Sequence, residues 1–147
     1  MQSKVKQIRD EESSVVLRPV GSAAYATAST QNNTGVPLNT LNTARWDNKD
    51  IPWHTIGAQI VVEAIDFADD DGTYTLQLEV GDDESFSNSV IAAQIVVTSA
   101  GPYQMLVDPD TVKQMQATSL YIRLNAVVTE TTPSITYHGW LFTLPLQ

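Results

Sequence analysis

The stretch TYTLQLEV, Thr73–Val80, decides the fold class because apolar and polar residues alternate along it with a period of two. Its apolar members are Tyr74, Leu76, Leu78 and Val80. Such alternation describes a strand with one face on a core and the other in water. Upstream, QIVVEAI, Gln59–Ile65, is rich in β-branched residues and nearly continuous in apolar character. We therefore expect a second strand that is buried on most of both faces.

The segment between these two strands is short and acidic, and it reads DFADDDG. Its Asp71-Gly72 pair suits a tight turn, since glycine accepts the positive φ that such a turn requires. We therefore expect the two strands to form a hairpin. A calcium loop does not fit, because an EF-hand register ending on Gly72 would place Phe67 at its first position. We expect a solvated hairpin tip and no metal site.

Further strands are expected along the rest of the chain, separated by turn residues such as Gly101-Pro102. The downstream strands are Val90–Thr98, Tyr103–Val107, Leu120–Thr129 and Ile135–Leu144. Weaker candidates upstream are Ser14–Arg18, Ala24–Thr30 and Val36–Leu41. Pro109–Ala117 carries the one helix signal, with Asp108 or Asp110 as its cap.

About eight short strands with almost no helix favour an all-β protein of two antiparallel sheets, a β-sandwich that is a jelly roll or a related Greek-key fold. The chain has 147 residues, which is the size of one domain. Within it we expect residues 1–50 to form a less regular N-terminal arm with edge strands. Residues 51–147 are expected to form the sandwich core.

Composition excludes several classes of function. The chain has no cysteine, so it has no disulfide framework and no thiolate metal ligand. The net charge is −9, and no basic residue occurs between Lys49 and Lys113. That field repels nucleic acid and anionic membranes, so we expect neither as a partner. No apolar stretch is long enough for a membrane span or an export signal, which predicts a soluble protein.

No catalytic motif is present. The serine-hydrolase elbow, the P-loop, the dinucleotide fingerprint and the zinc motif H-E-x-x-H are all missing from the sequence. The two histidines, His54 and His138, have no spacing that places them beside a nucleophile. The clustered acids stand in polar turns, without the apolar surroundings that raise a carboxyl pKa for acid catalysis. We expect no enzyme, no catalytic residue and no cofactor.

Three tryptophans are the most informative large side chains: Trp46, Trp53 and Trp140. Tryptophan stacks on sugar rings, and it also anchors protein interfaces. Ordinary packing at the sandwich edge accounts equally well for Trp46 and Trp53. The sequence leaves these alternatives open.

Two segments together carry a family pattern, which runs from about Gln59 to Leu144. The first, Gln59–Ser87, joins an apolar strand, an acidic D-G turn, TYTLQLEV and the turn GDDESFSNS. The second, Leu120–Phe142, contains YIRLN followed by a polar loop and a final strand. They resemble the central hairpin and the closing hairpin of jelly-roll capsid decoration (cement) proteins of tailed bacteriophages. The first 55 or so residues depart from that pattern.

The resemblance implies a homo-oligomer, with a trimer favoured over a dimer, that is made in the host cytoplasm and sits on the outer capsid surface of the virion. There it would bridge neighbouring major capsid subunits, and it would need no catalytic residue. We place the capsid or subunit contacts on Arg9, Arg18, Arg45, Trp46, Ile51 and Trp53. The alternative is a glycan-binding β-sandwich module of a phage tail or baseplate, which would use one or more of the three tryptophans.

Overall fold

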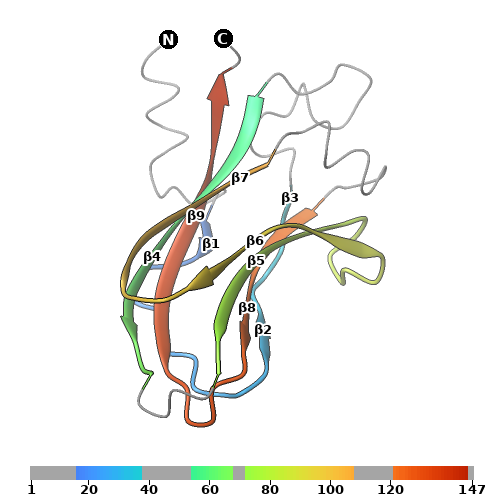
Figure 1. Cartoon of the computed structure of the whole chain (residues 1–147). Helices are drawn as coiled ribbons and strands as arrows, with labels where there is room; N and C mark the ends of the chain where they lie inside the picture. Colours follow the sequence, from blue (N-terminus) through green and yellow to red (C-terminus); the bar gives the residue numbers. More distant parts are fainter. Residues whose placement is uncertain (1–15, 38–53, 68–71, 108–120, 146–147) are drawn as a thin grey trace.

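The computed structural model describes residues 16–37, 54–67, 72–107 and 121–145, and these form nine strands and no helix (Figure 1). The strands are β1 (Val16–Arg18), β2 (Thr30–Asn32), β3 (Val36–Pro37), β4 (His54–Ile65), β5 (Tyr74–Gly81), β6 (Ser89–Val97), β7 (Gly101–Val107), β8 (Tyr121–Val128) and β9 (Ile135–Pro145). The longer predicted strands are confirmed in type, although β4 begins at His54 rather than at Gln59. The strand expected at Ala24–Thr30 is wrong, because that segment has only an isolated bridge at Tyr25 followed by bends, and β2 begins at Thr30. The helix signal at 109–117 lies outside the described residues.

The strands form two antiparallel sheets, which Figure 1 shows as two layers of one sandwich. Sheet A has the order β1-β9-β4-β7, and sheet B has the order β2-β8-β5-β6, with the short β3 also pairing with β8. Without β3, eight strands remain, and they pair from the outside inward: β1 with β9, β2 with β8, β4 with β7, and β5 with β6. This nested pairing is what results when one long hairpin folds over itself, and it defines a jelly roll. The expected all-β sandwich is confirmed.

The expected hairpin between QIVVEAI and TYTLQLEV is wrong. β4 pairs with β7 and β9 in sheet A, whereas β5 pairs with β6 and β8 in sheet B. The acidic link therefore crosses from one sheet to the other. Glycine is required at position 72 by close packing and not by a tight turn. A Cβ there would lie 2.4 Å from the backbone nitrogen of Glu130, which is too close for any other residue. Asp71 lies outside the described residues.

The closing hairpin expected from Leu120–Phe142 is also wrong, for the same physical reason. β8 belongs to sheet B and β9 to sheet A, so the loop between them is a second crossover. Alternation along one strand reports which side chains face the core, but it carries no information about the neighbouring strand. Among the described residues, a hairpin joins β5 to β6 through the loop 82–88. Its turn lies within the GDDESFSNS stretch.

One buried tyrosine ties the two crossovers together. The Tyr74 hydroxyl donates a hydrogen bond to the carbonyl oxygen of Asp66 at 2.5 Å, and it accepts one from the backbone nitrogen of Ser134 at 3.1 Å. Asp66 follows β4 and Ser134 precedes β9. The first residue of β5 thus fixes the end of the sandwich at which the chain changes sheets.

The core lies between the sheets and is built from alternate residues of the long strands. The apolar set of TYTLQLEV is confirmed as inward-facing, since its four side chains are at most 1% exposed. Each such side chain contributes about 1.5–3 kcal/mol relative to leaving it in water. The members contributed by sheet A include Ile56, Ala58, Ile60, Val62, Ile135, Tyr137 and Leu141. β4 is not buried on both faces along its length, because Glu63 and Ala64 are exposed.

Candidate interaction surfaces

The outer face of sheet A carries a cluster of aromatic, aliphatic and amide side chains. Alternation points them away from the core, since their neighbours along each strand are core residues. We call this cluster the aromatic face; its members are Gln59 on β4, Gln104 and Leu106 on β7, and His138, Trp140 and Phe142 on β9. The strand register places Gln59 opposite both Gln104 and Trp140. Three strands far apart in sequence therefore build one surface.

Phe142 forms the floor of this face. Its ring lies over Gly57, where a Cβ would come within 2.3 Å of a ring carbon, so only glycine fits beneath it. The ring is 3% exposed although it points away from the core. Leu106, which is opposite Gly57 on β7, is by contrast 50% exposed. The aromatic face thus combines a fixed aromatic floor with an exposed aliphatic side chain.

Trp140 stands next to a small hollow of about 90 Å³ that Gln59, Gln104 and Phe142 also line. The Gln59 amide nitrogen donates a hydrogen bond to the Tyr103 carbonyl oxygen at 3.2 Å, which fixes this side chain along the sheet. Trp140 also stacks on the His138 ring, with 6.0 Å between ring centroids and 14° between their planes. Stacking and hydrogen bonding hold these groups in place before any partner arrives.

The aromatic face is poor in charge. Among the described outward residues of sheet A, Glu63 is the charged one, and its carboxylate lies 3.4 Å from Nδ1 of His138. The chain as a whole has a net charge of −9. Described acids gather instead on sheet B and its hairpin turn, at Glu79, Asp82, Asp83 and Glu84. Sheet A therefore offers the less charged of the two outer faces.

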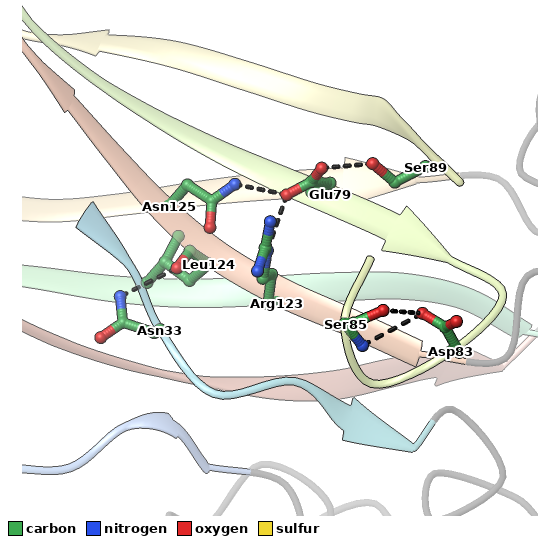
Figure 2. A network of polar contacts seen from close by, with 8 residues as sticks. All are labelled: Asn33, Glu79, Asp83, Ser85, Ser89, Arg123, Leu124 and Asn125. Atoms are coloured by element: carbon green, nitrogen blue, oxygen red, sulfur yellow. Dashed lines mark hydrogen bonds and ion pairs between the residues drawn. The ribbon is translucent and has the colours of Figure 1, made fainter. Parts of the chain in front are cut away.

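Glu79 organises a polar network on the outer face of sheet B (Figure 2). One carboxylate oxygen accepts hydrogen bonds from Nε of Arg123 and from the Asn125 amide, each at 2.7 Å, and the other accepts one from the Ser89 hydroxyl. Burial alone would raise the pKa of Glu79, but the bonds from Ser89, Arg123 and Asn125 and the arginine charge outweigh it and lower the pKa. Glu79 therefore stays ionised and holds Arg123 in one orientation.

Phe86 covers this network from the β5–β6 turn. Its ring lies 4.1 Å from the Arg123 guanidinium carbon, a cation–π contact. Its backbone has φ of 54°, a left-handed conformation that is costly for a residue with a Cβ. Asp83 shapes the turn by accepting hydrogen bonds from the backbone nitrogen and the hydroxyl of Ser85, at 3.0 and 2.8 Å. Those bonds lower the pKa of Asp83, Ser85 contributing most.

Arg18 is the one predicted contact residue that the structure describes, and it lies inside the sandwich at 6% exposure. Its guanidinium donates to the carbonyl oxygens of Tyr137 at 3.0 Å and Ala23 at 2.6 Å, and to Oδ1 of Asn33 at 2.9 Å. The guanidinium carbon also lies 4.4 Å from the centre of the Tyr137 ring. These contacts hold the N-terminal strands to β9. A role for Arg18 at a subunit interface stays a prediction, and these contacts within the chain do not support it.

The other predicted contact residues lie outside the described part of the chain: Arg9, Arg45, Trp46, Ile51 and Trp53. Of the three tryptophans, Trp140 is therefore the one whose surroundings are known. Sequence reasoning noted Trp140 and His138 but missed Gln59, Gln104 and Leu106. These three residues occupy outward positions in predicted strands, and that position was the one sequence feature that could have indicated them. It becomes informative only when the strand register is known, because the register places the three strands side by side. No three described histidine or acidic side chains gather as a metal site.

Comparison with known proteins adds little to this geometry. The chain matches no family model and no curated protein. A solved structure titled cowpea mosaic virus top component, naturally occurring empty particles, is similar at a TM-score of 0.35 and 14% identity, over 94% of this chain and 92% of that chain. A TM-score at this level is too low to assign a common fold, so the jelly roll rests on the strand pairs themselves. Within the described residues no helix has the length and apolar character to cross a membrane.

Proposed function

We propose that this chain is a non-enzymatic structural protein of a virion that binds other protein subunits through its aromatic face. The observation that carries the proposal is the composition of that face, which presents Trp140 and the half-exposed Leu106. Glu63, beside the face, is the charged outward residue described on sheet A. Protein interfaces have depleted charge at their centre and use aromatic anchors there. The acidic remainder of the chain keeps the free protein soluble.

The specific role we propose is that of a cement protein on the outer surface of a bacteriophage capsid. The nested strand pairing of a jelly roll supports it. The sequence resemblance of Gln59–Ser87 and Leu120–Phe142 to capsid decoration proteins holds for their strands and turns but not for the two hairpins, which are crossovers between sheets. The partners would be the major capsid protein and further copies of this chain, with a trimer favoured. The protein would be made in the host cytoplasm and would end on the virion. Many copies acting together turn a modest affinity per site into a large stabilisation of the shell.

Quantitative mass spectrometry of purified particles tests the role directly. A cement protein is expected at a copy number comparable to that of the major shell protein. Absence from the particles, or only a handful of copies in each, would refute the capsid role.

A pair of matched variants tests the surface. Leu106 and Val96 are 50% and 54% exposed, but Leu106 belongs to the aromatic face whereas Val96 lies on β6 of sheet B. Leu106→Asp is expected to weaken co-sedimentation with undecorated shells at least about tenfold, because it buries a charge at the contact. Val96→Asp is expected to leave binding unchanged. Equal binding by both variants, with thermal unfolding showing both to be folded, would refute docking through the aromatic face.

The glycan-binding alternative keeps one specific observation in its favour, the hollow between Trp140, Gln59 and Gln104. An aromatic ring beside two amides is a pattern that binds sugars as well as peptides. On this alternative, a neutral oligosaccharide would change the tryptophan fluorescence of the chain, and Trp140→Ala would abolish the change. Docking on protein predicts no such response from this hollow.

A further inference from the structure

A second hollow lies on the outer face of sheet B, on the opposite side of the sandwich from the aromatic face. It has a volume of about 430 Å³, within the range of roughly 300–1,000 Å³ that is typical of ligand pockets. Its lining includes Asn32, Thr34, Gly35, Glu84, Tyr121 and Arg123. These residues come from the end of β2 and the segment that joins it to β3, from the β5–β6 turn and from β8.

An irregularity in strand pairing forms the hollow. Asn32 pairs with Asn125 and Val36 pairs with Ile122, so three residues on one side face two residues on β8. The extra residue bends the segment away from the sheet, as a bulge does. The Asn33 side chain turns inward, where its amide nitrogen donates to the Leu124 carbonyl oxygen at 2.8 Å (Figure 2). Its neighbours Asn32 and Thr34 remain exposed.

Arg123 is held with its free end available to this hollow. Its Nε is bonded to Glu79 at 2.7 Å, and its guanidinium packs on the Phe86 ring. The two terminal nitrogens make no hydrogen bond among the described contacts, although the side chain is only 16% exposed. Phe86 is itself wedged over Gly35, where a Cβ would lie 2.6 Å from its ring. The terminal nitrogens of the Arg123 guanidinium are therefore preorganised as hydrogen-bond donors, and little side-chain conformational entropy is lost when a ligand binds them.

The charge balance of the hollow selects the class of ligand. The charge of Arg123 is already neutralised by Glu79, and Glu84 adds a further negative charge. Together with the net charge of −9, this disfavours an anion. The groups on offer are donors from Arg123, hydroxyls from Thr34 and Tyr121, and both a donor and an acceptor from the Asn32 amide. A ligand that donates and accepts many hydrogen bonds without charge matches this set.

We propose that this hollow binds a neutral saccharide, with Arg123, Thr34 and Asn32 bonding its hydroxyls and the Tyr121 ring packing against its C–H face. The inference does not depend on the capsid role, since it concerns the opposite sheet. On a particle docked through the aromatic face, the hollow would point away from the shell, so both surfaces can be occupied together.

Saturation-transfer NMR on the full chain tests the proposal, with D-glucose, D-galactose, D-mannose and N-acetyl-D-glucosamine as probes. Transfer to at least one of them is expected. Thr34→Val keeps the side-chain shape but removes the hydroxyl, and it should weaken binding about fivefold through the loss of one hydrogen bond. Arg123→Lys keeps the charge opposite Glu79 but loses the planar fork, and it should weaken binding at least as much.

Val96→Ala serves as the matched control and should leave the transfer intact, because Val96 is 54% exposed on β6 and does not line the hollow. Thermal unfolding checks that each variant is folded. Two results would overturn the proposal: no transfer to any of the four neutral sugars, or transfer that both Thr34→Val and Arg123→Lys leave unchanged. Each of these outcomes is separate from the copy number on particles, so the proposal and the capsid role can fail independently.

Discussion

Replacing Glu79 with glutamine tests how much the polar network on sheet B stabilises the fold. In the native chain the carboxylate accepts bonds from Arg123 and Asn125 at 2.7 Å and from the Ser89 hydroxyl. Glutamine keeps the shape of the side chain and one acceptor oxygen. It removes the negative charge and the acceptor that Ser89 uses. The substitution therefore isolates the charge-dependent part of the network.

The expected loss follows from the burial of the ion pair. The Glu79 and Arg123 side chains are 12% and 16% exposed. An exposed pair contributes roughly 0–1 kcal/mol, whereas removing one partner of a fully buried pair costs about 3–5 kcal/mol. At this partial exposure we expect Glu79→Gln to lower the free energy of unfolding by about 2 kcal/mol at neutral pH. For a domain of this size that corresponds to a fall in Tm of roughly 4–8 °C.

The loss should also depend on pH in a defined direction. The pKa of Glu79 is lowered from 4.5 in the folded chain, so the folded state favours the ionised form. Its contribution to stability is complete above pH 4.5 and is lost as the pH falls through the folded-state pKa. The difference between the native chain and Glu79→Gln should therefore be largest at neutral pH and should shrink in acid.

Urea unfolding, followed by circular dichroism at neutral and acidic pH, measures both effects. Glu63→Gln is the matched control, because the Glu63 side chain is 43% exposed and its carboxylate lies 3.4 Å from Nδ1 of His138. It should change the free energy of unfolding by less than about 0.5 kcal/mol. Equal losses for the two variants at neutral pH, or a Glu79→Gln loss that stays constant in acid, would refute the reasoning.

Three further substitutions test the packing. Gly57→Ala places a Cβ 2.3 Å from the Phe142 ring and should cost about 1–3 kcal/mol in thermal unfolding; an unchanged Tm would contradict the close approach. Tyr137→Phe removes the hydroxyl bonded to Gln31 at 2.7 Å and should cost about 1 kcal/mol. Burial raises the pKa of Tyr137 above 10.0, so the native chain should lose stability as pH rises beyond 10.0 and the variant less so in alkaline urea titrations. The Glu130 side chain is fully buried, and its carboxyl oxygens have no hydrogen-bond partner among the described residues, so Glu130→Met should stabilise the chain by about 1–3 kcal/mol against urea, and a loss would contradict the unpaired state of the carboxyl group.

The candidate surfaces could be predicted only in part. Trp140 and His138 could be noted from the sequence because tryptophan and histidine are candidate functional residues by side-chain type alone. Gln59 and Leu106 carry no such signal, and they join Trp140 only because the register of β4 with β7 and β9 brings them together. A shift of one residue in that register would send the same side chains into the core. A surface made by three strands is therefore a property of the pairing and not of any single stretch.

The fate of Arg18 shows the same limit. A charged residue near the start of the chain is expected to be solvated, which made an intersubunit contact a reasonable hypothesis. In the structure the register shifts between Val16 and Arg18, and Arg18 turns inward to bond the Tyr137 carbonyl oxygen. Burial of an arginine requires several acceptors placed in advance. Those acceptors come from segments that the sequence does not show to be neighbours.

The sequence by itself determined the long strands and, for TYTLQLEV, which face meets the core, because alternation is a local property that a pleated strand must satisfy. Only the tertiary structure decided which strands pair. Both expected hairpins, β4 with β5 and β8 with β9, were replaced by crossovers between sheets. The physical reason is that strand pairing is set by how both sheets pack over one core, and this condition involves the whole chain at once.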